Sequence, residues 1–546
     1  MTPPILKPPT FCRPLARHRS QSETCWNTYL KEETPMTKVV VHADSAYQQA
    51  KVDPRLWSAF TEHLGRCIYG GLYEPGHPSA DESGLRGDVM DIVRDLKVPL
   101  VRYPGGNFVS NYDWKEGIGP RADRPRRMEF AWASVETNQF GVDDFLQWAE
   151  RTGVTPMLAV NLGTGTIKEA AELVEYCNHP GGTYWSDLRR ANGHEEPYNV
   201  TYWCLGNEME GEWQAGHLSA ADYTKKALEA AKMMRWVDDS IKLVMCGSSY
   251  HMLPEYLDWD RVALSTLYPY VDYLSTHFYA MNEGQGDQRF VASYLDLDEH
   301  ISNAETAIRF VSAKHPDAAK VKICLDEWNV WNFQDIKMDS MDELLGKSRF
   351  EMTSAEPWEV APAILQEKYS LLDALAFGGM GITLLNHAGT VEIACIAQLV
   401  NVIAPLTTRP GGGVLKQSTY YPFELLSKYG HGTVLETRVS GDTYEVDGRE
   451  VPVVHVSVVH DQENDRVLVF ALNCALDAST DLDLELNGFT AIHVDQHFAV
   501  TADALSSTNT WEEPLQVATH SLPITDGTQV SLPAASWNLI VLNTAS

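Results

Sequence analysis

The sequence lacks the features that mark disulfide-rich, membrane-spanning and secreted proteins. Its nine cysteines are scattered singly, with no Cys-x-x-Cys pair, so they indicate reduced, buried thiols and not a disulfide framework or a zinc site. No apolar run reaches the ~18 residues that a membrane-spanning helix needs. Residues 1–36 contain no continuous apolar segment of a secretory signal, and we expect a disordered leader or a non-native start there. These absences predict a cytoplasmic protein.

Positive charge is also scarce. The chain of 546 residues has 43 Lys and Arg against 74 Asp and Glu, which gives a formal net charge of -31. Such a field repels polyanions, so neither nucleic acid nor an anionic membrane surface is expected as a partner. A neutral substrate is compatible with this charge, although acidity that only keeps a protein in solution explains it equally well.

What the sequence does contain is a regular alternation of two patterns. From about residue 57 to 405, short β-branched or aromatic runs alternate with amphipathic segments of helical period, such as 85–97 and 219–236. The predicted strands lie at residues 62–69, 98–103, 155–161, 201–206, 242–247, 271–278, 321–326 and 380–385. Eight such units predict an α/β protein built on a (β/α)8 TIM barrel, with its chemistry at the carboxyl ends of the strands.

Two further regions accompany the predicted catalytic barrel of residues 57–410. After three consecutive glycines at 411–413, the pattern changes to alternating strands with turn signals and no long helix, so residues 411–546 predict an all-β sandwich, similar to a jelly roll. A strand-like segment within residues 37–56 is expected to join this sandwich. The longest insertion, at about 333–358, predicts a loop beside the active face.

Three glutamates lie at the ends of predicted strands. Glu208 ends the fourth strand, Glu327 ends the seventh, and Glu62 opens the first. A barrel brings such ends to one rim, where one protonated and one ionised carboxyl group could cleave a glycosidic bond. Each glutamate could instead be a salt-bridged rim residue. The apolar flanks favour the functional interpretation, because a charge at a buried strand end is costly without a partner or a function.

Other polar groups gather at the same predicted rim. The segment Arg102-Tyr-Pro-Gly-Gly-Asn107 ends the second strand; its glycines let the backbone approach a ligand, while Arg102 and Asn107 offer hydrogen-bond donors. A tight turn with an incidental arginine is the alternative. His277 and Tyr279 end the sixth strand and could equally be core residues. Polar groups at five strand ends together favour an active site.

These segments resemble the α-L-arabinofuranosidases of glycoside hydrolase family 51, among the clan A retaining glycosidases. The resemblance extends from about residue 37 to the C-terminus and is carried by FTEHLGRCIYGGLYEP, VRYPGGNFVSNYDW, WCLGNEMEGEWQAGH, DYLSTHFY and DEWNVW. It implies a (β/α)8 barrel with a C-terminal β-sandwich that N-terminal residues complete. It also implies a homo-oligomer, expected to be a hexamer.

The resemblance assigns roles residue by residue. Glu208 would be the general acid/base and Glu327 the nucleophile of an exo-acting enzyme that removes terminal non-reducing α-L-arabinofuranosyl residues from oligo- or polysaccharides. The residues expected to bind the sugar or the nucleophile, or to flank the site, are Glu62, Arg102, Asn107, Asn207, Tyr279, Gln398, Trp132 and Trp213. No metal and no cofactor are expected, because the two carboxylates perform both steps.

Alternatives remain open at this point. A retaining β-xylosidase or an endoglucanase would keep the barrel and the mechanism and change the sugar. A non-catalytic carbohydrate-binding protein is disfavoured, because both Glu208 and Glu327 are present. If the two carboxyl groups lie about 5 Å apart, no water fits between them and the configuration of the sugar is retained.

Overall fold

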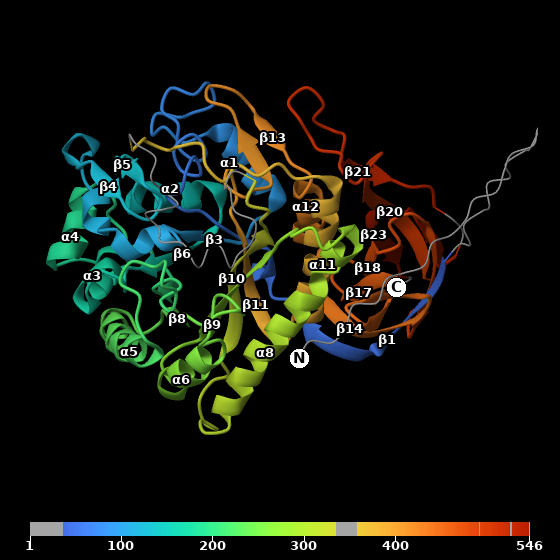
Figure 1. The fold of residues 1–546 in the computed structure, drawn as a ribbon. Coiled ribbons are helices and arrows are strands. Elements are labelled where there is room, and N and C mark those ends of the chain that lie inside the picture. The colour runs from blue at the N-terminus through green and yellow to red at the C-terminus, as the bar shows by residue number, and fades with distance from the viewer. Residues whose placement is uncertain (1–36, 335–357, 491, 525–526, 545–546) are drawn as a thin grey trace, which may run out of the picture. The chain divides into compact units, whose positions relative to one another are not determined.

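A closed barrel of eight parallel strands forms the centre of the structure (Figure 1). The computed structural model describes residues 37–334, 358–490, 492–524 and 527–544. The predicted leader at 1–36 and most of the predicted insertion at 333–358 lie outside the described residues. In the order in which they pair, the barrel strands are β10 (Lys322–Val330), β11 (Val391–Ala397), β2 (Ser58–Phe60), β3 (Leu100–Tyr103), β6 (Thr155–Val160), β7 (Tyr202–Leu205), β8 (Lys242–Met245) and β9 (Tyr273–Ala280).

The predicted TIM barrel is confirmed, but two of its predicted strands are wrong. Residues 62–69 form a turn-rich segment after the first strand, β2, which has only three residues. Glu62 therefore follows this strand and does not open it. Residues 380–385 belong to a helix, α11 (Leu371–Asn386), and the eighth strand is β11.

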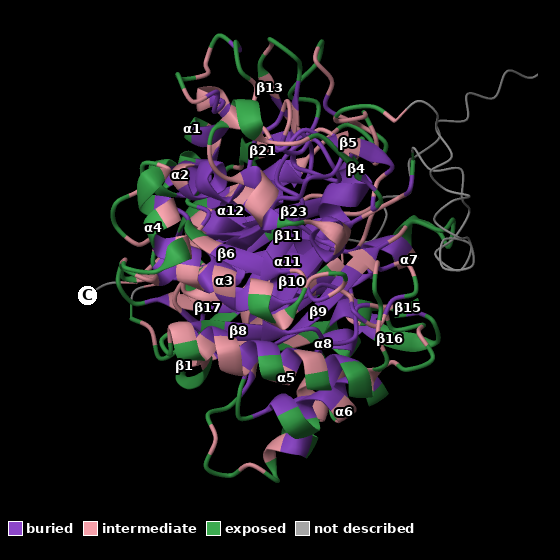
Figure 2. Ribbon diagram, turned by 90° about the vertical axis from the view of Figure 1, so that its left-hand side faces the viewer, coloured by how far each residue is buried: buried purple, intermediate pink, exposed green. Residues whose placement is uncertain are grey.

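Residues 380–385 of α11 resemble a strand in sequence because the helix is buried on every side. All residues from Leu371 to Leu385 are buried, and Figure 2 shows the helix in the buried interior. Such a continuous apolar run has neither the period of a strand nor that of an amphipathic helix. On one side Phe377 stacks on Trp328 of β10, with ring centroids 4.6 Å apart; on the other, Gly378 faces Trp537 of the C-terminal sheet.

The remaining helices alternate with the barrel strands, and most bury one face. Those predicted over 85–97 and 219–236 are confirmed as α1 (Gly87–Leu96) and α5 (Ala220–Val237), the second capped by the Ser219 side chain, which accepts from the Asp222 amide. The other α-helices around the barrel are α2 (Val142–Thr152), α3 (Ile167–Asn178), α4 (Tyr184–Ala191), α6 (Asp258–Leu267), α7 (Asp287–Val291) and α8 (Tyr294–Ser312). None of the described helices has both the length and the apolar composition needed to cross a bilayer.

The C-terminal part is built on one nine-stranded sheet. In pairing order its strands are β21 (Ala518–Ser521), β20 (His493–Thr501), β23 (Ser536–Asn543), β18 (Arg466–Asn473), β17 (Val454–Asp461), β14 (Thr433–Gly441), β1 (Thr37–Lys51), β19 (Thr480–Asn487) and β22 (Gln529–Leu532). The N-terminal strand β1 pairs antiparallel with β14 and parallel with β19. Segments far apart in sequence therefore complete one sheet.

This sheet has apolar residues on both faces. In β18, Val467 and Val469 belong to a core formed within the C-terminal part, together with residues of β1, β17 and β19. Leu468 and Phe470 belong to the core that continues into the barrel. Strict alternation of side chains between two buried faces explains why the strand is apolar throughout. The prediction of no long helix after residue 411 is wrong, because the helix α12 (Tyr420–Tyr429) lies in this part of the chain and packs against α11. The predicted domain boundaries stay a prediction.

Short elements complete the described chain. They are the 3-10 helices η1 (Pro54–Trp57), η2 (Asn107–Asn111), η3 (Trp114–Gly117) and η4 (Arg121–Asp123), and the strand pairs β4 (Arg127–Glu129) with β5 (Ser134–Glu136), β12 (Leu406–Thr408) with β13 (Val414–Lys416), and β15 (Thr443–Val446) with β16 (Arg449–Pro452). The seven described cysteines are buried free thiols. This agrees with the chemistry predicted from their spacing.

The contact between α11 and the sheet should tolerate no added atoms. A Cβ placed on Gly378 would lie 2.4 Å from the ring of Trp537, which is fully buried. We expect Gly378→Ala to lower the free energy of unfolding by about 1–3 kcal/mol, because overpacking forces the ring to move. Gly413→Ala, where a Cβ meets nothing within 4 Å, is the control. Equal denaturant midpoints for the two variants would contradict the close packing.

Candidate active site

The predicted site residues all converge on the carboxyl-terminal rim of the barrel. Their positions are Glu62 after β2, Arg102 in β3, Asn107 at the start of η2, Trp132 between β4 and β5, Asn207, Glu208 and Trp213 after β7, Tyr279 in β9, Glu327 in β10 and Gln398 after β11. Hydrogen bonds, ion pairs and the charge interaction between Glu62 and Glu327 join them into one network, described below. Convergence of this kind is the arrangement that a (β/α)8 barrel offers for catalysis.

Arg102 is the buried cation of this network. Its side chain is 1% exposed, and its guanidinium lies 2.8 Å from Glu327 Oε1, 3.1 Å from Asp326 Oδ2 and 2.6 Å from Asn207 Oδ1. The guanidinium also lies over the ring of Phe60, 4.6 Å from its centroid. Burial opposes the charge, but Asp326 and Glu327 hold the pKa of Arg102 well above its ordinary value. The guanidinium therefore stays charged and fixes two carboxylates at once.

The carboxylate of Glu327 is held at both oxygens. Arg102 donates to Oε1, and the hydroxyl of Tyr279 donates to Oε2 at 2.7 Å. The Nδ1 atom of His277 lies 3.7 Å from the same Oε2. These contacts restrict rotation of the carboxylate and leave it close to His277 of β9 and to Glu208, which follows β7.

Glu208 is held differently. Its Oε1 accepts from His277 Nδ1 at 2.9 Å, its Oε2 accepts from Trp213 Nε1 at 2.7 Å, and its backbone has a φ of 43°, a left-handed conformation that only a few residues other than glycine adopt. Burial acts to raise the pKa of Glu208, but the hydrogen bond and charge of His277 outweigh it and lower that pKa. Glu208 is therefore ionised in the free enzyme, beside a proton on His277.

That proton is held by three carboxylates. Burial acts to lower the pKa of His277, but Glu327, Asp326 and Glu208 raise it well above the ordinary value of 6.5. His277 Nε2 lies 3.4 Å from Asp326 Oδ1, on the opposite side of the ring from Glu208. Arg102 alone does not neutralise the three carboxylates, and the imidazolium of His277 balances part of the remaining negative charge.

One ligating atom from each of Glu208, His277 and Glu327 lies within 4.8 Å of the other two. This distance also permits a metal ion, which would have to displace the proton from a nitrogen of His277. The separation instead fits two carboxyl groups too close to admit a water molecule between them, which are about 5–5.5 Å apart in enzymes that form a covalent glycosyl intermediate.

Glu62 forms the far wall of the site. Its Oε1 accepts from the Phe108 amide at 2.9 Å and from Trp132 Nε1 at 3.0 Å, and its Oε2 accepts from Gln398 Nε2 at 3.1 Å. Burial and the charge of Glu327 outweigh these hydrogen bonds and raise the pKa of Glu62 to about 8. At neutral pH this carboxyl group therefore carries a proton most of the time and can donate a hydrogen bond.

The paired glycines leave room for the side chain of Glu62, and their predicted approach to a ligand stays a prediction. A Cβ on Gly106 would lie 2.5 Å from Glu62 Oε2, and one on Gly105 would lie 3.0 Å from its Cγ. Larger residues would push the carboxyl group out of the site. Asn107, which follows them, lies 3.5 Å from Asn207 through its Oδ1.

Two charged residues of the network were not among the predicted site residues. The sequence predicts His277 as a possible core residue, and Asp326 enters the sequence analysis only as the first residue of the segment DEWNVW. A regular strand would point adjacent residues to opposite faces, but the pairing of β10 with β9 and β11 is irregular between Cys324 and Trp328. The sequence signal that could have identified Asp326 is the acidic pair Asp326-Glu327 at the end of an apolar run.

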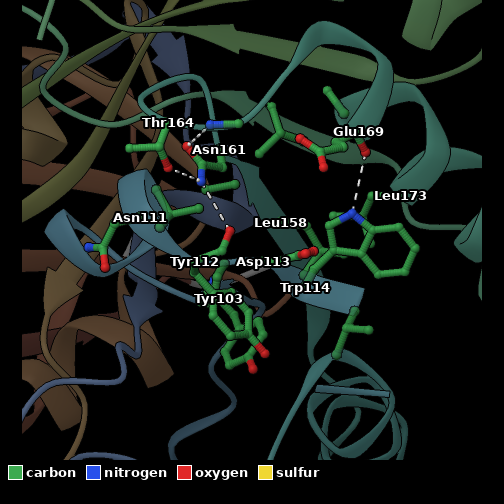
Figure 3. A pocket seen from close by; sticks show the side chains of 17 residues that line it. Tyr103, Asn111, Tyr112, Asp113, Trp114, Leu158, Asn161, Thr164, Glu169 and Leu173 are labelled. Atoms are coloured by element: carbon green, nitrogen blue, oxygen red, sulfur yellow. Dashed lines mark hydrogen bonds between the residues drawn. The ribbon is translucent and has the colours of Figure 1, made fainter. Parts of the chain in front are cut away.

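A cavity of about 170 Å³ lies beside the network and is not part of it (Figure 3). It lies against η2, and none of the predicted site residues lines it. Some of its polar groups bind one another: Asn161 Nδ2 donates to the carbonyl oxygen of Tyr112 and to Thr164, and Trp114 Nε1 donates to the carbonyl oxygen of Glu169. Two further lining groups, Asn111 Nδ2 and the hydroxyl of Tyr112, are buried with no hydrogen-bond partner among the described residues.

The chain is similar in sequence to two family models and to enzymes of known activity. Residues 92–313 match the model of the alpha-L-arabinofuranosidase 1 domain, and residues 326–536 match that of the alpha-L-arabinofuranosidase C-terminal domain. An intracellular exo-alpha-(1->5)-L-arabinofuranosidase of Bacillus subtilis is 41% identical over 94% of this chain and 100% of its own. An exo-alpha-(1->6)-L-arabinofuranosidase of Bifidobacterium longum is 42% identical over 91% of this chain and 96% of its own.

Solved structures agree with the described fold. A family 51 alpha-L-arabinofuranosidase from Bifidobacterium longum superposes with a TM-score of 0.86 at 36% identity, covering 93% of this chain and 100% of that one. The alpha-L-arabinofuranosidase from Thermotoga maritima, solved as an arabinose complex, gives a TM-score of 0.80 at 31% identity and covers 92% and 99% of the two chains.

The raised pKa of Glu62 has a measurable consequence for stability. The folded protein keeps a proton on Glu62 up to about pH 8, whereas an ordinary glutamate releases it near 4.5, so the unfolded state binds fewer protons in this window. Stability relative to Glu62→Gln should therefore fall as the pH rises from about 4.5 to about 8, and then level off. Chemical denaturation at several pH values measures this slope.

The exposed Glu212, in the connection that also carries Glu208, supplies the control variant Glu212→Gln. A stability difference between the wild type and Glu62→Gln that stays constant over this pH range would show that Glu62 is already ionised.

Proposed function

The chain belongs to the α-L-arabinofuranosidases of glycoside hydrolase family 51, and we propose that it removes terminal non-reducing α-L-arabinofuranosyl residues by a double displacement that retains configuration. The observation that supports this mechanism is the separation of Glu208 and Glu327, whose carboxylate oxygens approach within 4.8 Å. Because the chain belongs to this family, we do not propose the alternatives of a β-xylosidase, an endoglucanase or a non-catalytic binding protein.

In the first step, Glu327 attacks the anomeric carbon. Arg102 and Tyr279 hold its oxygens in a fixed orientation, so little reorganisation is needed when the carboxylate forms the covalent bond. Glu208 delivers a proton to the leaving oxygen. In the second step the same Glu208 removes a proton from water, which then releases the sugar from Glu327.

The proton that Glu208 must deliver is close at hand. In the free enzyme it resides on His277, one hydrogen bond of 2.9 Å from Glu208 Oε1. We infer that this proton passes to Glu208 when the substrate excludes water from the site. Without water, the neutral forms of His277 and Glu208 are favoured over their ion pair. Asp326 and Glu327 keep His277 oriented for this transfer.

The sugar is proposed to lie among the partly exposed members of the network. Glu208, Asn107, Tyr279, Trp132 and Trp213 retain some exposure, whereas the others are buried. Buried Glu62, Gln398 and Asn207 would then bind sugar hydroxyl groups from behind. A site enclosed by these side chains suits one terminal sugar residue better than the interior of a polysaccharide chain. This supports exo action.

The relatives suggest the setting of the reaction. Several are named intracellular enzymes, and their names include both (1->5) and (1->6) linkages. We accordingly propose a cytoplasmic enzyme of arabinan catabolism that acts on arabinose-containing oligosaccharides, requires no metal or cofactor, and assembles as a hexamer by family resemblance.

The proposed function is tested with p-nitrophenyl α-L-arabinofuranoside and, as a competitor, p-nitrophenyl β-D-xylopyranoside. The wild type should prefer the arabinofuranoside, and Glu327→Ala should lose more than about a thousandfold in kcat. Sodium azide should then rescue each carboxylate variant differently. Glu327→Ala should yield an inverted glycosyl azide, because azide attacks the substrate directly, whereas Glu208→Ala should yield a retained one from the covalent intermediate.

The exposed Glu212→Ala serves as the control and should keep wild-type turnover. Preference for the xyloside would refute the proposed substrate. Azide products of the opposite configurations would instead mean that Glu208 is the nucleophile and Glu327 the acid/base.

A further inference from the structure

The contact between Trp132 and Glu62 joins the barrel to a short hairpin that is not part of it. Trp132 lies in the turn between β4 and β5, and its Nε1 donates to Glu62 Oε1 at 3.0 Å. The two strands have three residues each, and Met128 and Phe130 of this hairpin are 57% and 60% exposed. The position of Trp132 therefore depends on the side chains that the hairpin buries.

Glu136, the last residue of β5, anchors the hairpin to the segment that carries Glu62. Its Oε2 lies 2.8 Å from His63 Nδ1, and its Oε1 accepts from the amide of Asn138 at 2.5 Å and from the hydroxyl of Tyr69. His63 directly follows Glu62 in the chain, and Tyr69 lies in the same turn-rich segment after β2. One carboxylate thus ties the hairpin to the barrel rim.

The two side chains of this anchor form a buried ion pair. Both Glu136 and His63 are buried. Burial acts to raise the pKa of Glu136, but its contacts with His63 and its hydrogen bond from Tyr69 outweigh burial and lower that pKa. An ionised carboxylate can only accept, so His63 Nδ1 donates to it. Separating a buried pair of this kind is costly, and the two groups therefore stay together in the folded protein.

The ring of His63 also supports the second donor to Glu62. It stacks on Phe108, with ring centroids 4.5 Å apart and planes 13° from parallel, and the amide of Phe108 donates to Glu62 Oε1. Its Nε2 lies 2.8 Å from the hydroxyl of Tyr103, the last residue of β3. The side chain of His63 therefore supports Trp132 through the hairpin and the Phe108 amide through the ring stack.

From these contacts we propose that His63 and Glu136 are positioning residues, which hold both hydrogen-bond donors of Glu62 Oε1 in place. The inference rests on the proposed function, because Glu62 and Trp132 are among the residues proposed to bind the terminal sugar. Moving a group that orients a substrate by about 1 Å can lower the reaction rate about a hundredfold. The pair acts on the reaction through Glu62, at one residue's remove from the sugar.

The test measures hydrolysis of p-nitrophenyl α-L-arabinofuranoside by variants of this anchor. Glu136→Gln keeps the shape of the side chain and removes its charge. It should lower kcat/KM about tenfold and raise KM about threefold, because the wall then holds the sugar less firmly. Tyr69→Phe removes only the hydroxyl that donates to Glu136, and it should change both constants in the same direction by smaller factors. It carries the same test if Glu136→Gln does not fold.

A double-mutant cycle shows whether the anchor acts through Glu62. In the Glu62→Ala background the carboxyl group that the donors hold is absent, so adding Glu136→Gln should lower kcat/KM by less than about twofold. The matched control is Asp143→Asn. Asp143 of α2 is also buried and accepts from two tyrosine hydroxyls, those of Tyr176 at 2.7 Å and Tyr198 at 2.8 Å. This variant should leave KM and kcat/KM unchanged.

Unchanged kinetics in the folded variants Glu136→Gln and Tyr69→Phe would overturn the proposal. It would also be overturned by a fall in kcat with an unchanged KM, which a smaller fraction of folded enzyme explains, or by a loss of full size in the Glu62→Ala background. Failure of the wild type to hydrolyse the aryl arabinofuranoside would instead refute the proposed function itself.

Discussion

The buried charge cluster around Arg102 is the interaction on which the site depends. Three carboxylates, Glu208, Asp326 and Glu327, lie close together and are balanced by Arg102 and the imidazolium of His277. Removing one partner of such a buried pair costs about 3–5 kcal/mol, because the remaining charge stays without compensation. Arg102 belongs to β3 and reaches across to β10, from which it is separated by β2 and β11. Barrel closure is thus a condition for the cluster.

The C-terminal sheet supports the same cluster from outside the barrel. It packs on α11 where Gly378 meets Trp537, and α11 in turn packs on β10, where Phe377 stacks on Trp328 beside Glu327. Asn332, just beyond β10, donates to Asp373 at the start of α11. The position of Glu327 is therefore set by a continuous core that extends from sheet to barrel, and a change in this packing would move a carboxylate whose two oxygens are both bound.

Much of this arrangement could be predicted from the sequence, because strand ends of a barrel converge whatever the details of packing. That argument was sufficient to bring Glu208 and Glu327 together, although their catalytic roles stay predictions. It was insufficient for the eighth strand, because α11 is buried on all sides and shows no period. It also missed Asp326 and His277, since the sharing of one proton and one guanidinium among several carboxylates is a property of distances in space, which a single sequence does not contain.

If the close pair of carboxyl groups enforces retention, the stereochemistry of sugar transfer to an added alcohol will reveal it. Hydrolysis of an aryl α-L-arabinofuranoside in the presence of methanol, followed by proton NMR before the products equilibrate, reports the configuration of the methyl arabinofuranoside formed. We expect the α-anomer, because methanol replaces water in attacking the intermediate on Glu327. Formation of the β-anomer would mean direct displacement by the solvent nucleophile and would contradict the account.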